Sequence, residues 1–528
     1  MLPDYYAILG IHPSATFDEV KQAFRALARQ YHPDMQPGSA AASATEQFRA
    51  IYDAYNTIAS PASRASYDRQ WTQQRGQMVK SSQGTWGTSP AASPQGGPPA
   101  PVASLDLACY LSHSQVPVYP QEQMIYALSE LTPLLDGQTP NTLPINLCIA
   151  LDRSSSMGGD KLLAVKKALR AHIEQLRPGD ILSIVAFDNR AEVIARAETK
   201  QLREVLIAAV DRLNERGGTE IAKGLEAALE EARRFSRQAM VSHIILLTDG
   251  KTYGDEERCL ELAFQARQQG IAITALGIGT EWNDHLLDQI ADLSEGMSDY
   301  LAGADDIAAA IDMRVRALRN TLATNVHISL ELEGGVRLRR VTRVAPDIAE
   351  LMDAAPADQR WMLAREAEMN VGIISAGRQG TALALLWELM LPSNVTGRYV
   401  LGQMNIRYDI PYANLTGLRK SGQLAVEFVE AHMLTSTGVS QRVKQVIEYV
   451  TAYRVQNRAQ EITEQGDHTT ASALMHTAAL RLRDAAQEDL ANQAQEHAEQ
   501  LAQKQAPPRA SLLKLKYSTK NLYSYQRA

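Results

Sequence analysis

Four apolar runs between residues 143 and 320 alternate with amphipathic segments. The first covers residues 145–151, and the others cover residues 179–188, 241–250 and 270–279. A run that is apolar throughout predicts a strand buried on both faces, whereas the segments between the runs have the period of helices. Strands and helices in alternation predict a doubly wound α/β domain over residues 143–320, with helices on both faces of a parallel sheet.

The stretches on either side of this domain show the periodicity of strands. Residues 105–142 contain two short strand-like segments, and residues 321–430 contain an alternating segment followed by further apolar runs. The most economical arrangement is one antiparallel β-sandwich that is built from both stretches. The α/β domain would then be an insertion in this sandwich.

The amino-terminal part is helical in pattern. Residues 18–31 and 45–60 each place apolar side chains at helical spacing. Pro33 cannot continue the first helix, so Asp34 is expected in a loop at the tip of a helical hairpin. Residues 72–104, rich in Gln, Gly, Ser and Pro, cannot bury a core and are expected to be a flexible linker with a reach of roughly 30 Å.

The carboxyl-terminal part is also helical in pattern. Residues 431–505 are expected to form a helical hairpin or a short bundle, with a break at Gly466 and Asp467. The last stretch, residues 506–528, is basic and contains three tyrosines. Two interpretations of this tail remain open, namely docking on the acidic body of the protein and binding to a phosphate-rich partner.

Composition narrows the classes of partner and the cellular location. A chain of 528 residues should divide into several domains. Its net charge of -7 provides no general attraction to nucleic acid or to an anionic membrane. The first residues lack the pattern of a signal peptide, and no apolar stretch is long enough to cross a bilayer, so a cytoplasmic location is expected. Three scattered cysteines argue against a disulfide framework and against a cysteine zinc site.

Basic residues recur every four positions along the first helix and lead to the hairpin tip. Taken alone, these residues could be a solvated helix face followed by a turn. Together with DYYAILGI at residues 4–11 and the segment ending in YDR at residues 48–69, however, they resemble the J domain of DnaJ-type co-chaperones over residues 1–71. The resemblance implies that a DnaK-type seventy-kilodalton chaperone is bound, and its ATPase stimulated, by His32, Pro33, Asp34, Lys21, Arg25 and Arg29.

Two departures from the full DnaJ pattern limit this resemblance. Met35 stands where the family commonly has a lysine. The glycine/phenylalanine segment and the cysteine-rich zinc module are missing, so client binding of that kind is not expected. Another part of the chain must select the target.

Hydroxyl and carboxylate side chains follow the predicted strands of the α/β domain. In a doubly wound sheet, ligands bind at the carboxyl ends of the strands. Serine and aspartate at these positions could simply cap helices. If they converge, they offer the hard oxygen ligands that suit Mg²⁺ or Mn²⁺. The residues concerned are Asp152, Ser154, Ser156, Thr219 and Asp249.

The order of these residues, DRSSS, then GGT, then TDG, resembles the metal-ion-dependent adhesion site of von Willebrand factor A domains. The resemblance implies that Ser154 and Ser156 are direct ligands of the ion and that Thr219, Asp152 and Asp249 bind it directly or through water. An acidic side chain of a protein partner would complete the coordination. More weakly, the order of the flanking strands resembles bacterial von Willebrand A proteins in which a sandwich braces this domain.

These resemblances predict a non-enzymatic co-chaperone adaptor. The von Willebrand A domain would capture a protein partner through the metal, and the tethered J domain would bring a DnaK-type chaperone to that partner. An alternative is a metal-dependent scaffold in a signalling or MoxR-type ATPase complex, in which the J domain is incidental. A phosphoryl-transfer enzyme is a third possibility, but no GxSxG or GxxxxGK[ST] motif is present.

Overall fold

The computed structural model describes ten segments of the chain, which are residues 54, 104–134, 143–198, 202–235, 240–252, 254–353, 366–370, 374–375, 383–434 and 440–525. The chain divides into two compact units, residues 1–97 and 98–528. Apart from Ala54, the first unit lies outside the described residues. The predicted helical hairpin and the linker up to residue 103 are therefore among the calls that fall outside them.

The predicted α/β domain is confirmed. Its sheet has the strand order β6-β5-β4-β7-β8-β9 among the described residues. All four predicted runs form parallel strands of this sheet, namely β4 (Ile145–Asp152), β5 (Ile181–Phe187), β7 (Val241–Thr248) and β8 (Ala272–Ile278). The edges are β6 (Ala191–Ala195), which is antiparallel to β5, and β9 (Met297–Leu301).

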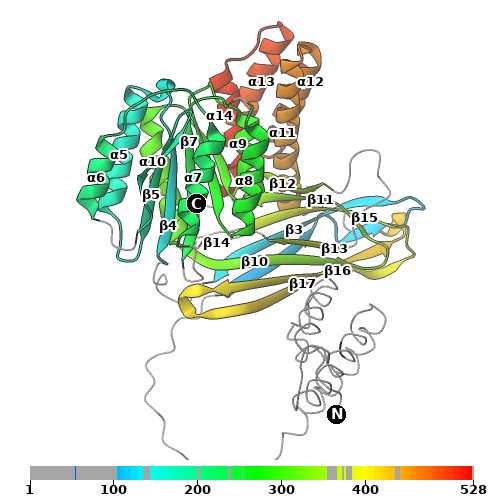
Figure 1. Ribbon diagram of the computed structural model, residues 1–528. Helices are drawn as coiled ribbons and strands as arrows, with labels where there is room; N and C mark the ends of the chain where they lie inside the picture. The colour runs from blue at the N-terminus through cyan, green and yellow to red at the C-terminus, as the bar shows by residue number, and fades with distance from the viewer. Residues whose placement is uncertain are drawn as a thin grey trace, which may run out of the picture. The chain divides into compact units, whose positions relative to one another are not determined.

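Successive residues of the central strand β4 point to opposite faces of the sheet. Leu147 and Ile149 belong to the core under α5 (Asp160–Glu174), α6 (Arg203–Asp211) and α10 (Ala304–Arg319). Cys148 and Ala150 belong to the core under α7 (Ile221–Arg233), α8 (Glu256–Gln268) and α9 (Asp284–Leu293). Figure 1 shows these two groups of helices on opposite sides of the sheet. Burial on both faces explains why the strands are apolar without alternation.

Strands from both sides of the α/β domain meet in a five-stranded sheet with the order β1-β3-β15-β11-β12. Upstream of the domain lie β1 (Ser104–Leu111) and β3 (Gln123–Leu134), and downstream lie β11 (Arg337–Ala345), β12 (Ala349–Asp353) and β15 (Leu383–Leu391). Strands β3 and β15 pair directly, with Ser129 opposite Leu385.

A further sheet has the order β13-β10-β16-β17-β2, with β14 paired to β10. Its strands are β2 (Gln115–Pro117), β10 (Thr321–Leu332), β13 (Glu366–Asn370), β14 (Ile374–Ser375), β16 (Gly397–Ile410) and β17 (Leu415–Val429). Trp387 of the five-stranded sheet and Met404 of this one belong to the same buried cluster. The expectation of purely antiparallel pairing is wrong for β2, which pairs parallel to β17. This short strand lies in the connection between β1 and β3, and the direction in which that connection runs past β17 sets the parallel pairing.

Four longer helices form the carboxyl-terminal region. They are α11 (Gln441–Glu464), α12 (His468–Asp484), α13 (Glu488–Ala502) and α14 (Arg509–Lys520), and a single turn, α15 (Leu522–Tyr525), follows. The predicted break is present: Gly466 has a φ of 86°, and the Asp467 side chain caps α12 by accepting a hydrogen bond from the Thr470 amide. Residues 509–520 of the basic stretch form α14.

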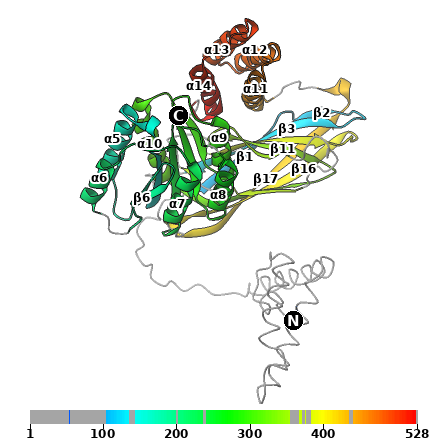
Figure 2. The same ribbon diagram turned by 45° about the horizontal axis from the view of Figure 1, so that its top comes forward.

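Two of the three lysines of α14, Lys516 and Lys520, are buried against carboxylates of α9, which lies beside α14 in Figure 2. Lys516 Nζ lies 2.7 Å from both Asp284 and Asp288, and Lys520 Nζ lies 2.8 Å from Asp288. Burial alone would lower the pKa of Lys520, but the neighbouring acidic groups, Asp288 first among them, together outweigh it and hold that pKa well above its ordinary value. These ion pairs agree with the first interpretation of the basic stretch, docking on the acidic body of the protein.

We predict that Lys520→Met lowers the free energy of unfolding by about 3–5 kcal/mol, because it removes a fully buried partner of the Asp288 carboxylate. Urea denaturation followed by circular dichroism measures the change. The control is Arg458→Met, which breaks an exposed ion pair with Glu461 and should alter stability little. Equal effects of the two substitutions would contradict a stabilising role for the buried pairs.

Candidate metal centre

Two buried carboxylates lie at the carboxyl edge of the parallel sheet. Asp152 ends β4, and Asp249 follows β7. These strands are neighbours, with Leu151 opposite Leu247, so the two side chains reach the same edge. Their exposed fractions are 0% and 1%. Because a buried carboxylate is costly without compensating partners, the surrounding groups must supply them.

The loop after β4 supplies hydroxyl groups. The Ser154 amide donates to Asp152 Oδ1 at 2.8 Å, which turns the chain back over the end of its own strand. A 3-10 turn at Ser155–Met157 then brings Ser156 within 3.0 Å of Ser154, measured between their hydroxyl oxygens. Ser156 also donates to Asp249 Oδ1 at 2.7 Å. The serines therefore bridge the two strand ends.

Thr219 approaches from the loop before α7, and Gly250 leaves room for it. A Cβ atom at Gly250 would lie 2.8 Å from Thr219 Oγ1 and 3.7 Å from Asp152 Oδ2. The threonine hydroxyl is thus held close to the carboxylate across a position that has no side chain. A cavity of about 610 Å³ opens here, lined among others by Ser154, Ser156, Thr219 and Asp249. Asp152 is fully buried and does not line the cavity itself. The structure brings together all five residues singled out in the sequence.

The electrostatics of this edge favour a cation. The pKa of Asp152 is raised to about 6, mainly by burial and to a smaller degree by the Asp249 charge, while hydrogen bonds from Thr248 and Ser154 act to lower it. Thr248 donates to Asp152 Oδ2 at 2.6 Å. Carboxylate and hydroxyl oxygens are the donors that Mg²⁺ and Mn²⁺ prefer. The residues present therefore fit a divalent ion in number, in chemistry and in charge.

A lysine at this site was not singled out in the sequence. Lys161, in the first turn of α5, places Nζ 2.5 Å from Asp249 Oδ2. Its position, two residues after the glycine pair that follows DRSSSM, would have indicated it, because the first turn of a helix after a strand faces the carboxyl edge of the sheet.

A buried ion pair fixes the loops that carry the ligand candidates. Arg153 Nε lies 2.9 Å from Asp188 Oδ2, and Arg216 Nε lies 3.0 Å from the same oxygen. The Arg216 amide donates to the Arg153 carbonyl, and the Glu220 amide donates to the Asp188 carbonyl. Burial acts to raise the pKa of Asp188, but hydrogen bonds from Arg216 and Arg153 outweigh it and lower that pKa. Sequence reasoning missed Asp188, since an acid that ends a strand has many possible roles.

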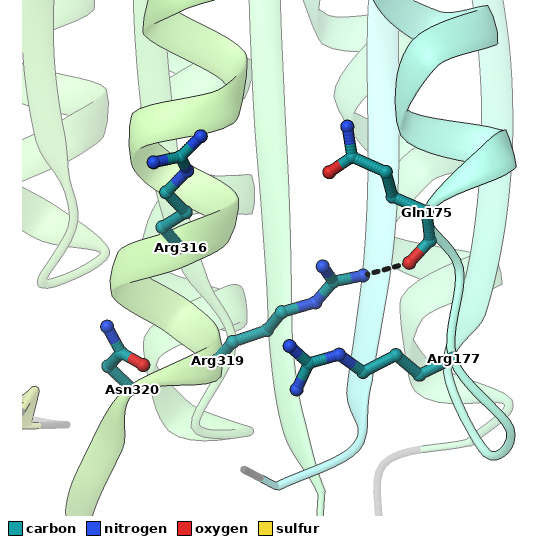
Figure 3. Close-up of a pocket in the computed structure, with 5 residues that line it drawn as sticks. All are labelled: Gln175, Arg177, Arg316, Arg319 and Asn320. Atoms are coloured by element: carbon teal, nitrogen blue, oxygen red, sulfur yellow. Dashed lines mark hydrogen bonds between the residues drawn. The ribbon is translucent and has the colours of Figure 1, made fainter. Parts of the chain in front are cut away.

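A second cavity, of about 620 Å³, lies beside the amino end of β5 and is lined by three arginines, Gln175 and Asn320 (Figure 3). Arg319 donates to the Gln175 carbonyl and to Asp180 Oδ2, each at 3.0 Å. The arginines lie at the carboxyl ends of α5 and α10, where the helix dipoles favour positive charge. Local structure thus accounts for these side chains.

The predicted chaperone-binding residues cannot be placed in this way. His32, Pro33, Asp34, Lys21, Arg25 and Arg29 lie outside the described residues.

Comparison with protein families agrees with this architecture. The von Willebrand factor type A domain family matches residues 146–310, the DnaJ domain family matches residues 4–68, and the Sll0103-like C-terminal alpha-helical domain family matches residues 441–524. The α/β domain is therefore a von Willebrand factor type A domain, and a J domain precedes it in the chain.

Individual relatives make the assignment more specific. Protein sll0103 of Synechocystis is 32% identical over 338 residues, which are 64% of this chain and 78% of that protein. The chain therefore belongs to the Sll0103-like family. The chaperone protein DnaJ of Acetivibrio thermocellus is 50% identical over 66 residues, which are 12% of this chain and 17% of that protein, so this likeness is confined to the J domain.

A solved structure shows the same fold. A von Willebrand factor type A protein from Catenulispora acidiphila superposes with a TM-score of 0.64 at 19% identity and covers 79% of this chain and 96% of its own. Within the part of the chain that is described, no helix has the length and apolar character needed to span a membrane.

We predict that Asp188→Asn lowers the free energy of unfolding by about 3 kcal/mol, because Arg153 would stay buried without its charged partner. Urea denaturation measures this change. The matched control is Asp211→Asn, which neutralises an exposed carboxylate paired with Arg170 and should have no measurable effect. A stable Asp188→Asn variant would show that the loops are held by other contacts.

Proposed function

We propose that this protein is a non-enzymatic co-chaperone adaptor of the cytoplasm. Its von Willebrand A domain binds a protein partner through a divalent metal, and its J domain recruits a DnaK-type chaperone to that partner and stimulates its ATPase. The observation that carries this proposal is the convergence of five oxygen donors at one sheet edge, in a chain that also contains a J domain. A tether between the two raises the effective concentration of the chaperone near the captured partner to about the millimolar range.

The proposed metal ligands are Ser154, Ser156, Thr219, Asp152 and Asp249, and the ion is Mg²⁺ or Mn²⁺. When bound, the ion supplies a Lewis-acidic position that an acidic side chain of the partner can occupy. The serines are positioned for this role because their hydroxyls already contact each other and Asp249. Asp152, which is held by Thr248 and by the Ser154 amide, sets the negative charge beside the cavity.

We further propose that the two outer sheets form a β-sandwich that braces the inserted adhesion domain. Buried residues from both sheets belong to one cluster, and β3 and β15, which lie before and after the adhesion domain in the sequence, are adjacent strands. Both ends of the adhesion domain are therefore tied to strands of the same pair of sheets. Such a base would keep the metal edge rigid while a partner is bound.

For the J domain, we predict that Asp34→Asn abolishes stimulation of DnaK ATPase and leaves partner capture intact. The carboxylate at the hairpin tip is the proposed trigger, whereas capture belongs to the metal edge. Steady-state ATP hydrolysis by DnaK with the wild-type or the variant chain measures the first effect. Unchanged stimulation would refute the co-chaperone assignment. If the wild-type chain also failed to stimulate DnaK but co-purified with an AAA ATPase, the alternative scaffold function would be favoured.

For the adhesion domain, we predict that Asp152→Ala combined with Ser154→Ala abolishes divalent-ion binding and partner capture while DnaK stimulation persists. Mn²⁺ titration followed by electron paramagnetic resonance measures the first effect, and affinity purification with and without a chelator measures the second. Ser155→Ala is the matched control, because this serine lies in the same loop but its hydroxyl donates to the Gly217 carbonyl. Capture that persists in the double variant and in chelator would exclude a metal-dependent contact.

A further inference from the structure

Lys161 occupies the side of Asp249 that the serines leave open. The Asp249 side chain is fully buried, and its Oδ1 accepts a hydrogen bond from Ser156. Its other oxygen, Oδ2, lies 2.5 Å from Lys161 Nζ, which is also 3.4 Å from the Ser156 carbonyl. A buried carboxylate at the proposed metal edge therefore already has a cationic partner supplied by the chain itself.

The other charged side chains around the cavity are arranged differently. Glu220 lies 2.6 Å from Lys223, an ion pair on the outer surface, while Lys251 and Glu281 are exposed residues on the cavity lining. Among the described residues, Lys161 makes one ion pair, and it is with Asp249. The Lys161 side chain is itself 33% exposed, so it can move into solvent without breaking any other ion pair.

The geometry points to Lys161 as an internal cation that sets both the affinity of this site for a divalent ion and the charge that the loaded site presents. This inference rests on the proposed metal-dependent function and concerns its regulation. Asp152 and Asp249 carry two negative charges, and Lys161 reduces the net charge of the edge to about -1. Without Lys161, a divalent ion would meet a more negative edge and would bind more tightly.

The same charge has the opposite effect on the partner. A divalent ion bound to two carboxylates leaves a neutral edge, whereas the additional lysine charge makes the loaded edge positive. A positive edge attracts the acidic side chain that the proposed function requires of a partner. Lys161 thus weakens binding of the metal and strengthens binding of an anionic group, so capture depends on both the ion concentration and the acidity of the partner.

The test is a Mn²⁺ titration of the full chain in four forms, namely wild type, Lys161→Met, Lys161→Arg and Lys251→Met. Lys161→Met should bind Mn²⁺ on the order of tenfold more tightly, because a positive charge beside the ion is removed. Lys161→Arg keeps the charge and should stay close to wild type. Lys251→Met removes an equal charge from an exposed position on the same cavity, where solvent and salt screen it, and should also stay close to wild type.

Thermal unfolding in the absence of metal provides a second readout. Lys161→Met should melt at a lower temperature than wild type without metal, because Asp249 stays buried without its ion pair, and it should gain more from added Mn²⁺. If wild type binds Mn²⁺ and Lys161→Met binds it equally or less tightly, the inference is overturned while the metal site stands. An equal gain in Lys251→Met would also overturn it. If no form binds Mn²⁺, the proposed function fails and the inference fails with it.

Discussion

Two carboxylates buried side by side are the constraint that organises this protein. The register of β4 and β7 brings Asp152 and Asp249 to the same sheet edge, where water cannot stabilise them. Nearby polar groups compensate for the lost hydration. Thr248 and the Ser154 amide donate hydrogen bonds to Asp152, and Ser156 and Lys161 bind Asp249. The resulting pocket is negative at its base and lined with hydroxyls, which are the properties expected of a divalent-ion site.

The need to pair buried charges also holds the carboxyl-terminal helices against the α/β domain. Asp284 and Asp288 of α9 form ion pairs with Lys516 and Lys520. Separating α14 from α9 would leave these charges without their partners, which is energetically costly. Arg509 extends the contact by donating to the carbonyls of Thr280 and Trp282, which flank the cavity residue Glu281. The helical region is therefore in direct contact with a loop that borders the cavity of the proposed metal centre.

The sequence predicted the features that depend on local pattern. Apolar runs predicted the strands, and the order of serine, threonine and aspartate at the strand ends predicted residues that the structure brings together at one sheet edge. The sequence could not predict contacts between charged residues that lie far apart along the chain. Asp188, Lys516 and Lys520 are charged residues within mixed sequence, and only the fold shows that each faces a buried opposite charge. The position of Lys161 in the first turn of a helix indicates that it faces the sheet edge, but its ion pair with Asp249 is seen only in the fold. For residues 506–528 the sequence left two interpretations open, docking on the acidic body and binding to a phosphate-rich partner, and the structure shows Lys516 and Lys520 docked on α9.

The pairing of β3 with β15 has a consequence for how the protein is made. Leu385 is synthesised about 250 residues after its partner Ser129. At roughly 5–20 residues per second, a ribosome needs on the order of 10–50 s to reach it. During that interval the nascent chain holds an apolar strand with one edge unpaired, a state prone to aggregation. The topology of the chain therefore predicts that the protein itself benefits from a chaperone while it emerges from the ribosome.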